Sequence, residues 1–385
     1  MRILSIHNRY NLPGGEDEVQ FAECNLLRQH GHDVTEYVQD NDSIKGNKLL
    51  SVGLRSVWSQ TDFTSIRSLI RQSRAEIITV HNFFPLVSPS VYYAAHAEGI
   101  PVVQTLHNFR LICPAATLLR DGKICEDCVG KMVAHPAIAH ACYRQSRMLT
   151  TGLVTMTSAH RLIGTWSRTV DRYIALTPFM KNKFIEGGFP ADKITVKPNF
   201  TRDTGLGNGA RGNFLYVGRL SPEKGVATLL KAWQLSGSER ELRIVGTGPE
   251  ELALRAQAST LKGVRFLGQL PRKRVQAEMG DAVALIMPSI WYEGFGLTII
   301  EAFAKGTPVI ASDLGAMASL VSPGISGYLF EAGNEHQLAT RIRNYNSLPN
   351  LRSGARQAYE DRFTPEINYR LMMDIYASVI HVHSF

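Results

Sequence analysis

The sequence lacks any long run of apolar residues. No segment of the 385-residue chain reaches the ~18 apolar residues in a row that a membrane-spanning helix needs. The chain also begins directly with a short apolar strand, Ile3 to Ile6, whereas an export signal has a charged segment followed by a longer apolar one. We therefore expect a cytoplasmic protein, which would meet a membrane only as a peripheral protein at its inner face.

Acidic residues are fewer than basic ones, and the imbalance is local. The chain has 42 Lys and Arg against 34 Asp and Glu, and residues 101–197 alone hold 13 basic and 6 acidic residues, or +7 of the total +8. Because the sequence has no arginine-rich arm, aromatic stacking motif or helix-turn-helix pattern, we expect no nucleic acid partner. The basic stretch predicts an anionic membrane surface, a pyrophosphate-linked lipid or an acidic glycan instead. A merely solubilising surface is the alternative.

Cysteine is scarce, and four of the five cysteines lie in the stretch Leu111–Tyr143. Cys125 and Cys128 have the C-x2-C spacing that holds one metal ion from a tight turn, and Cys113 and Cys142 would complete a tetrahedral zinc site. A second C-x2-C pair is absent, and disulfides are disfavoured inside cells. The pattern leaves three alternatives open: structural zinc, a redox pair, or plain thiols.

Two successive patterns of alternating strands and helices occupy the chain. The segment 201–212 between them is rich in Gly, Asn and Thr, which is typical of a linker. We therefore predict an α/β protein with an N-terminal domain at 1–200, a second domain at 213–360 and a closing helical segment at 361–385. A protein of this length commonly has two domains.

The first half opens with a predicted strand at 2–8, a loop at 11–15 and a helix at 16–28. Gly14 and Gly15 lie at the start of that helix, where a phosphate or sugar can approach the backbone. A polar, irregular segment is expected at 40–60. Two later strands end at His81 and His107, and ligands gather at the carboxyl ends of strands in open α/β sheets. A purely structural role is the alternative for each histidine.

The second half opens with a predicted strand that ends at Gly218 and Arg219. Lys224 follows in the loop, so two cations lie beside the next helix N-terminus, where a diphosphate would be bound. The loop is not a Walker A motif, because G-x4-G-K-[ST] is absent. The next strand ends in the turn of Gly246 and Gly248, which we expect at the same edge of the sheet.

The stretch Ile290–Ala311 carries two glutamates, Glu293 and Glu301, with seven residues between them. The glycines Gly294 and Gly296 let the backbone approach a ligand closely before a helix begins at Leu297. Glu301 is followed by Ala and Phe, so we expect it to be buried in an apolar helix and to need a partner or ligand. Two solvated glutamates are the alternative.

These motifs together resemble a known family. EGFGLTIIE resembles the E-x7-E motif of retaining glycosyltransferases of family 4, which have the GT-B fold. The segment from Gly218 to Gly225 resembles the family's G-R-x4-K-G element, and 171–199 resembles the end of its N-terminal domain. The resemblance covers nearly the whole chain. It implies two Rossmann-like domains with doubly wound parallel sheets facing a central cleft, and a last helix that crosses back to the N-terminal domain.

The resemblance also implies roles for residues. Arg219 and Lys224 would neutralise the departing diphosphate, Glu301 would hold the ribose hydroxyls, and Glu293 would hold the donor sugar. His107 would lie beside that sugar, although Asn108 stands where the family commonly has Asp. The implied catalytic residues are His107, Glu293, Arg219 and Lys224. The implied donor-binding residues are Gly14, Gly15, Gly218, Arg219, Lys224, Gly246, Gly248, Gln269, Leu270, Glu293, Gly294, Phe295, Gly296, Leu297 and Glu301.

The implied function is transfer of a sugar, with retention, from a UDP- or GDP-sugar to a glycan or lipid-linked acceptor in bacterial surface-polysaccharide biosynthesis. The sequence does not show the pair of carboxylates that flank the bond in retaining glycosidases. We therefore expect departure of the diphosphate on the front face, with no cofactor and no metal at the phosphates. A sugar-nucleotide epimerase and a non-catalytic sugar-nucleotide-binding subunit are the alternatives.

Overall fold

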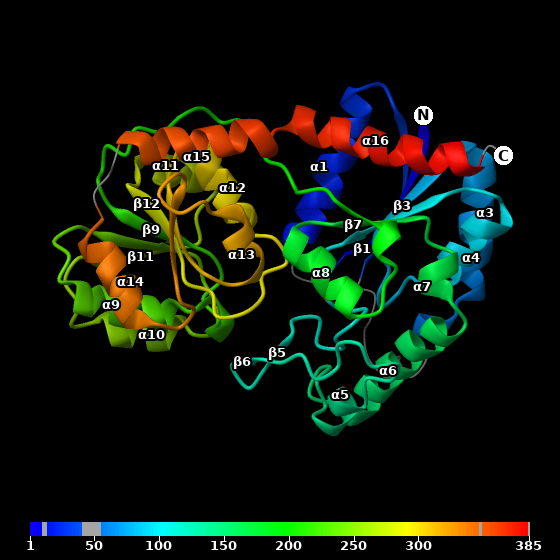
Figure 1. The fold of residues 1–385 in the computed structure, drawn as a ribbon, viewed down its shortest axis with the longest axis horizontal. Helices are drawn as coiled ribbons and strands as arrows, with labels where there is room; N and C mark the ends of the chain where they lie inside the picture. The colour runs from blue at the N-terminus through cyan, green and yellow to red at the C-terminus, as the bar shows by residue number, and fades with distance from the viewer. Residues whose placement is uncertain (10–13, 41–54, 346–348, 384–385) are drawn as a thin grey trace. The chain divides into compact units, whose positions relative to one another are not determined.

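The computed structural model describes residues 1–9, 14–40, 55–345 and 349–383. Residues 11–13 of the predicted first loop and 41–54 of the predicted irregular segment lie outside the described residues. The chain forms two compact units, which Figure 1 shows with their helices and strands labelled. Unit 1 holds residues 1–118, 125–198 and 368–385, and unit 2 holds residues 119–124 and 199–367.

Unit 1 is built on a six-stranded parallel sheet with the order β2-β1-β3-β4-β7-β8. β3 and β4 are buried along their whole length, as expected for strands covered by helices on both faces. The strands are β1 Arg2–Arg9, β2 Asp33–Asp40, β3 Ile77–Asn82, β4 Val102–Leu106, β7 Arg172–Ala175 and β8 Ile194–Val196. Because β1, β3 and β4 are neighbours and parallel, the residues at their carboxyl ends meet at one edge.

Helices cover both faces of this sheet. They are α1 Gly15–Gln29, α3 Gln60–Ser73, α4 Ser90–Ala97, α5 His135–Ala139, α6 Arg147–Leu162, α7 Thr165–Arg168, α8 Pro178–Glu186, the short 3₁₀ helix η2 Ala191–Lys193 and α16 Pro365–His383. Figure 1 shows α16, in red, running along the same unit as α1. The helix packs Met372 and Tyr376 into a core with Leu27 of α1 and Ile3 of β1, so the last helix is part of this unit.

Unit 2 repeats the architecture with the order β11-β10-β9-β12-β13-β14, again all parallel. Its strands are β9 Phe214–Val217, β10 Leu242–Val245, β11 Val264–Gly268, β12 Ala284–Met287, β13 Val309–Ser312 and β14 Gly327–Phe330. Its helices are η3 Pro222–Lys224, α9 Val226–Ser236, α10 Glu251–Ala258, α11 Arg272–Asp281, α12 Leu297–Ala304, α13 Gly315–Leu320, α14 Glu335–Arg343 and α15 Pro349–Arg362. The predicted two-domain α/β fold is confirmed.

Three segments differ from the sequence prediction. The sequence pattern over 355–380 predicts helix, but the structure has two helices there, α15 and α16, because Pro365 starts a helix readily but cannot continue one. The pattern over 148–170 is amphipathic and predicts a helix, which in the structure ends at Leu162, and Gly164 then takes a left-handed φ of 81°. Within the basic cysteine stretch, β5 Leu119–Arg120 and β6 Lys123–Ile124 form an antiparallel hairpin.

The segment 201–212, predicted as a linker, packs against unit 2. The N–H of Gly207 donates to Lys305 O at 3.0 Å, and the N–H of Gly209 donates to Gly280 O at 2.9 Å. A Cβ on Gly207 would lie 2.2 Å from Gly280 Cα, so glycine is needed for this close approach. At Gly207, the glycine that contributes to the linker-like composition allows tight backbone packing.

Candidate functional site

Glycines shape the strand ends of unit 2. A Cβ on Gly246 would lie 1.9 Å from Gly218 O, and one on Gly248 would lie 2.3 Å from Leu220 O. The backbone N–H of Gly218 already donates to Val245 O, and that of Gly246 donates to Gly268 O. These glycines therefore bring two loops into contact, and the N–H groups of Gly218 and Gly246 are used within the fold.

Lys224 and Glu293 meet at this edge. Lys224 Nζ donates to both carboxylate oxygens of Glu293, at 2.8 and 3.0 Å, and Ser289 Oγ donates to Oε1 at 2.7 Å. Gly225 makes the approach of the two loops feasible, because a Cβ there would lie 2.0 Å from Pro288 O. Glu293 is only 7% exposed. The sequence had assigned the two side chains to different parts of the donor, and the fold joins them.

The ion pair sets the charge of Glu293. Burial alone would raise the pKa of this carboxyl group, but the Lys224 ammonium and the hydrogen bonds from Lys224 and Ser289 outweigh it. The net result is a pKa below the ordinary value, so Glu293 is a carboxylate at neutral pH. A carboxylate held by a cation and a hydroxyl is suited to accepting hydrogen bonds and is a weak nucleophile.

Arg219 contrasts with Lys224. Its side chain is exposed at the end of β9, and within the described residues its guanidinium makes no hydrogen bond or ion pair. Its backbone is fixed, because Tyr216 Oη donates to Arg219 O at 2.9 Å. A guanidinium with free donors at the carboxyl end of a parallel strand is suited to bidentate binding of a phosphate.

Glu301 is less buried than the sequence analysis predicted. The sequence predicted that it is buried in an apolar helix, but its side chain is 24% exposed, and its Oε1 lies 3.3 Å from Arg272 Nη2 of α11. Of the two motif glutamates, the buried one is Glu293, in the loop before α12. The reason is that α12 buries the face of Ile299, Ile300 and Phe303, and Glu301 lies off that face.

The remaining predicted donor residues lie in two places, between β12 and the start of α12 and in the loop after β11. Gly296 has a φ of 106° and ends the loop directly before Leu297, the first residue of α12. Phe295 is buried and contacts Phe363, so its side chain belongs to the core. Gln269 is exposed and Leu270 is half-buried, in the loop after β11. Gly294 is half-buried between the two glutamates.

In unit 1, three histidines lie at the carboxyl ends of neighbouring strands. His7 lies near the end of β1, His81 lies near the end of β3 and His107 follows β4. His81 Nδ1 and His107 Nε2 are 3.0 Å apart. A small pocket beside them is also lined by Asn108 and Arg110. The sequence analysis singled out His81 and His107 but not His7. His7 also lies near the carboxyl end of a predicted strand, so the same criterion could have identified it.

Asp17 binds both the backbone at the start of α1 and the side chain of His7. Asp17 Oδ2 accepts the backbone N–H of Gly14 at 2.8 Å, and Asp17 Oδ1 lies 2.8 Å from His7 Nε2. Gly14 is the N-cap of α1, which begins at Gly15. The predicted phosphate contact at Gly14 N–H is thus already occupied by a carboxylate of the same helix.

The histidines next to the pocket are neutral at physiological pH. Burial lowers the pKa of His107 well below its ordinary value, and neighbouring His81 lowers it further. Burial likewise lowers the pKa of His81, and nearby His7 and Lys197 act in the same direction. A neutral imidazole offers one donor and one acceptor, so which nitrogen carries the proton decides what His107 can bind.

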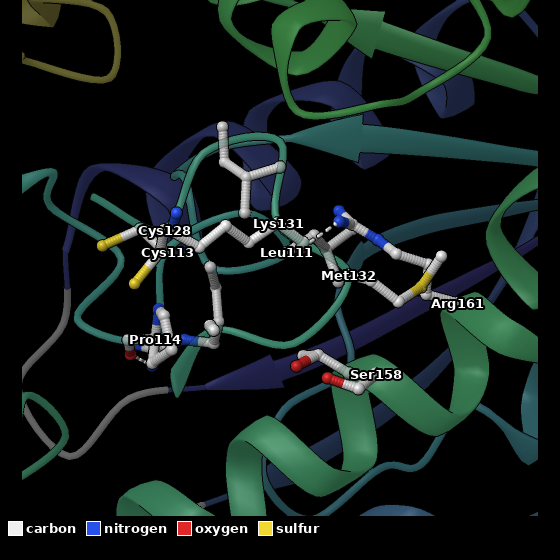
Figure 2. A pocket seen from close by; sticks show the side chains of 12 residues that line it. Leu111, Cys113, Pro114, Cys128, Lys131, Met132, Ser158 and Arg161 are labelled. Atoms are coloured by element: carbon white, nitrogen blue, oxygen red, sulfur yellow. Dashed lines mark hydrogen bonds between the residues drawn. The ribbon is translucent and has the colours of Figure 1, made fainter. Parts of the chain in front are cut away.

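The predicted zinc site gains no support from the structure. Among the described residues, no group of three or more His, Cys, Asp or Glu side chains could hold a metal ion. None of the four cysteines forms a disulfide among the described residues. Burial raises the pKa of the Cys128 thiol to about 11, and the neighbouring thiols of Cys113, Cys142 and Cys125 act in the same direction. Figure 2 shows Cys113 and Cys128 lining one small pocket with Arg161, whose guanidinium donates to Lys131 O at 2.7 Å. Plain thiols are the alternative consistent with this arrangement.

Comparison with solved structures defines the class. Sucrose-phosphate synthase from Thermosynechococcus elongatus matches with a TM-score of 0.71 at 16% identity, over 99% of this chain and 100% of that one. The Anabaena protein HepE in complex with UDP and glucose matches with a TM-score of 0.65 at 19% identity, over 97% and 99%. The protein therefore has the GT-B fold of two Rossmann-like units.

Comparison of sequences places the chain within that class. The family described as Glycosyltransferase Family 4 matches residues 14–203, and the one described as Glycosyl transferases group 1 matches residues 202–362. The chain belongs to glycosyltransferase family 4.

Two relatives show how far the sequence similarity extends. Phosphatidyl-myo-inositol mannosyltransferase of Mycobacterium leprae is 37% identical over 165 residues, 41% of this chain and 42% of that protein. Glycogen synthase of Mycobacterium tuberculosis is 29% identical over 274 residues, 64% and 66%. The match thus spans less than half of the first relative and about two thirds of the second.

Proposed function

We propose that this protein is a retaining glycosyltransferase that uses a nucleotide diphosphate-sugar. The observation that supports the proposal most directly is the contrast between the two cations of unit 2. Lys224 is paired with buried Glu293, whereas the Arg219 guanidinium is exposed and makes no hydrogen bond or ion pair within the described residues. Arg219 would bind the diphosphate and stabilise its charge as the sugar departs.

The state of Glu293 favours front-face departure of the diphosphate. A nucleophilic carboxylate would have to leave Lys224 and Ser289 to attack the anomeric carbon. Held by both groups, Glu293 instead would accept hydrogen bonds from hydroxyls of the donor sugar. Glu301, which is partly exposed in the middle of α12, would bind the ribose hydroxyls.

Unit 2 is thus the proposed donor-binding part and unit 1 the proposed acceptor-binding part. His107 would contact the sugar that is transferred. UDP is the first nucleotide to test, because the structure of the Anabaena neighbour is a complex with UDP and glucose. GDP is the second. The proposed acceptor is a glycan or lipid-linked sugar in surface-polysaccharide assembly. The proposed transfer uses no metal ion at the phosphates of the donor.

Calorimetric titration of UDP, GDP and ADP into the wild type and Arg219→Ala tests the donor site. We expect one nucleotide to bind and the variant to bind it more weakly, with Lys231→Ala on the exposed side of α9 unchanged. Equal binding by the wild type and Arg219→Ala would remove Arg219 from the site. Product analysis separates the alternatives, since transfer requires an acceptor, epimerisation does not, and a binding subunit converts nothing.

We also propose peripheral contact of unit 1 with an anionic membrane. Residues 129–170 contain no acidic residue and five basic ones, Lys131, Arg144, Arg147, Arg161 and Arg168. Exposed apolar side chains lie in the same stretch: Met132, Val133, Met148, Leu162 and Ile163. Basic and apolar side chains together suit a surface with anionic headgroups. No helix within the described ranges is long and apolar enough to cross a membrane.

Sedimentation with vesicles tests this contact. We expect the full chain to bind vesicles rich in phosphatidylglycerol more tightly than vesicles of phosphatidylcholine, and Leu162→Ser to weaken binding. Leu252→Ser is the matched control, because Leu252 is 85% exposed on α10 of unit 2. Equal binding to both vesicle types, or no difference between the two variants, would contradict the proposal.

A further inference from the structure

His107 is the end of a chain of polar contacts inside unit 1. His107 Nε2 lies 3.0 Å from His81 Nδ1. On the other side of the same ring, His81 Nε2 lies 3.6 Å from Glu23 Oε2. Glu23 Oε1 in turn accepts a hydrogen bond from Lys197 Nζ at 2.6 Å. The four residues come from α1, β3, the loop after β4 and the loop after β8, so only the folded sheet brings them together.

The inner members of this chain are shielded from water. Lys197 is 0%, Glu23 3% and His81 4% exposed. Lys197 Nζ also donates to Asn368 Oδ1 of α16 at 3.3 Å, and Asn368 Nδ2 donates to Pro198 O at 2.7 Å. Since buried groups cannot exchange partners with water, their hydrogen-bond directions are fixed by one another.

The geometry allows two arrangements of the protons on the two histidine rings. The electrostatic interaction of His81 with Glu23 decides which of the two is more stable. In the first, His81 carries its proton on Nε2, facing the Glu23 carboxylate, and its Nδ1 accepts the Nε2–H of His107. In the second, the lone pair of His81 Nε2 would face that carboxylate at 3.6 Å, which is repulsive at this distance in a buried site. The first arrangement is therefore favoured.

We propose that Glu23 and His81 are positioning residues that fix the tautomer of His107. Glu23 orients the N–H of His81, His81 accepts the Nε2–H of His107, and the Nδ1 of His107 is left as an unprotonated acceptor. Lys197 supplies the counter-charge that keeps the Glu23 carboxylate in place. Neither Glu23 nor His81 needs to touch a substrate for this effect.

The consequence for the reaction rests on the proposed function. A His107 that presents an acceptor nitrogen can receive a hydrogen bond from a sugar hydroxyl, and its lone pair favours the positive charge that develops at the anomeric carbon as the diphosphate leaves. It cannot give a proton from that nitrogen. His107 would thus serve as an acceptor that orients the sugar, and the proton on its other nitrogen remains with His81.

Nitrogen NMR of the full chain with ¹⁵N-labelled histidine rings tests the tautomer directly. The signals of His107 are those lost in the His107→Gln spectrum. We expect the Nε2 of His107 to show the shift of a protonated ring nitrogen and Nδ1 that of an unprotonated one. The reverse pattern in the wild type would overturn the inference, whether or not the protein transfers sugar.

Two variants of His81 test the positioning role. His81→Asn keeps a side-chain oxygen near the position of Nδ1 and should preserve the tautomer and most of the rate. His81→Leu removes the acceptor, so we expect both tautomers of His107 and a kcat lower by roughly 10–100-fold, as for other partners that orient a histidine. His96→Leu, at an exposed site on α4, should change neither. An unchanged His107 tautomer in His81→Leu would overturn the role, and if that variant fails to fold, the wild-type and His81→Asn spectra still decide.

Nucleotide binding separates this inference from the proposed function. UDP and GDP affinities should be equal in the wild type, His81→Asn and His81→Leu. If the expected tautomer is seen but no sugar is transferred from any donor, the proposed function fails and the tautomer assignment stands. If sugar is transferred and the wild-type tautomer is the opposite one, the proposed function stands and this inference fails.

Discussion

Lys224 and Glu293 form a bidentate ion pair inside unit 2, with Nζ 2.8 and 3.0 Å from the two carboxylate oxygens. They are 69 residues apart in sequence and come from the loops after β9 and β12, two neighbouring parallel strands. The pair fixes the shape of the loop that leads into α12. Near the end of β9, Arg219 is then the cation whose guanidinium has no hydrogen-bond or ion-pair partner among the residues that the structure describes.

The ion pair should stabilise unit 2. We expect Glu293→Gln to lower the free energy of unfolding by about 1–3 kcal/mol, because the Lys224 ammonium, 22% exposed, loses its counter-charge. Urea denaturation of Glu293→Gln, Lys224→Met and the double variant gives the coupling energy. The exposed pair Arg255–Glu251 on α10 is the control and should couple by less than about 0.5 kcal/mol. A coupling no larger than in that control would contradict this prediction.

Arg219→Ala should change activity without changing stability. Its guanidinium is exposed and makes no bond with the described part of the chain, so unfolding should be unaffected. Loss of its charge at the departing diphosphate should lower the transfer rate by roughly 10²–10³-fold. Steady-state kinetics and thermal unfolding of Arg219→Ala and Lys231→Ala measure the two effects. A normal rate, or a large loss of stability in Arg219→Ala, would show that its role is different.

Glu301 should affect nucleotide affinity more than Arg272 does. Loss of a charged partner for the ribose hydroxyls costs about 1.5–3 kcal/mol, so Glu301→Ala should bind nucleotide roughly 10–100-fold more weakly. The Arg272–Glu301 pair is partly exposed and weak, at about 0–1 kcal/mol, so Arg272→Ala should change affinity little. Calorimetric titration of both variants measures this difference. An equal loss of nucleotide affinity in the two variants would mean that binding depends on the Arg272–Glu301 ion pair and not on Glu301 alone.

The buried pair of Glu23 and Lys197 should be costly to break. Both side chains are almost fully buried and their atoms are 2.6 Å apart. Lys197→Met leaves the Glu23 carboxylate without a counter-charge, and we expect a loss of about 3–5 kcal/mol. The double variant Glu23→Gln/Lys197→Met should recover part of that loss, because no charge remains buried. A double variant that is less stable than Lys197→Met alone would contradict this prediction, because the unpaired Glu23 carboxylate would then not be the source of the loss.

Stability should depend on pH through the buried histidines. Burial lowers the pKa of His81, His107 and His160 in the folded protein, whereas in the unfolded chain they titrate near 6.5. Below about pH 6.5 the unfolded chain therefore binds more protons, so stability falls as the pH decreases toward the folded-state pKa values. Urea denaturation at several pH values should show constant stability from about pH 7 to 8 and a decrease below about 6.5. His107→Gln should make that decrease shallower, and an identical slope in this variant would contradict the assignment.

The sequence by itself determined the architecture, and it predicted where the proposed donor site lies. Alternating apolar strands and helices in two halves predicted a two-domain α/β protein, because the spacing of apolar residues is a local property. The family resemblance implied that both sheets are parallel. Arg219, Lys224 and Glu293 were found from short motifs, since glycines and charges at strand ends are visible in sequence. Most of the differences in the helices came from single residues, such as Pro365 and Gly164, that end a helix inside an otherwise regular pattern.

The tertiary structure decided which charges meet. The sequence placed Glu301 in the interior and Glu293 in a loop, and the structure reverses their burial because the buried face of α12 excludes Glu301. Glu23 and Lys197, 174 residues apart, were not found at all, since nothing in the local sequence marks a partner on another strand. Packing of distant elements sets the distance between two charges and their exposure to water, and those two quantities decide whether a charged residue is paired, free or able to orient a catalytic group.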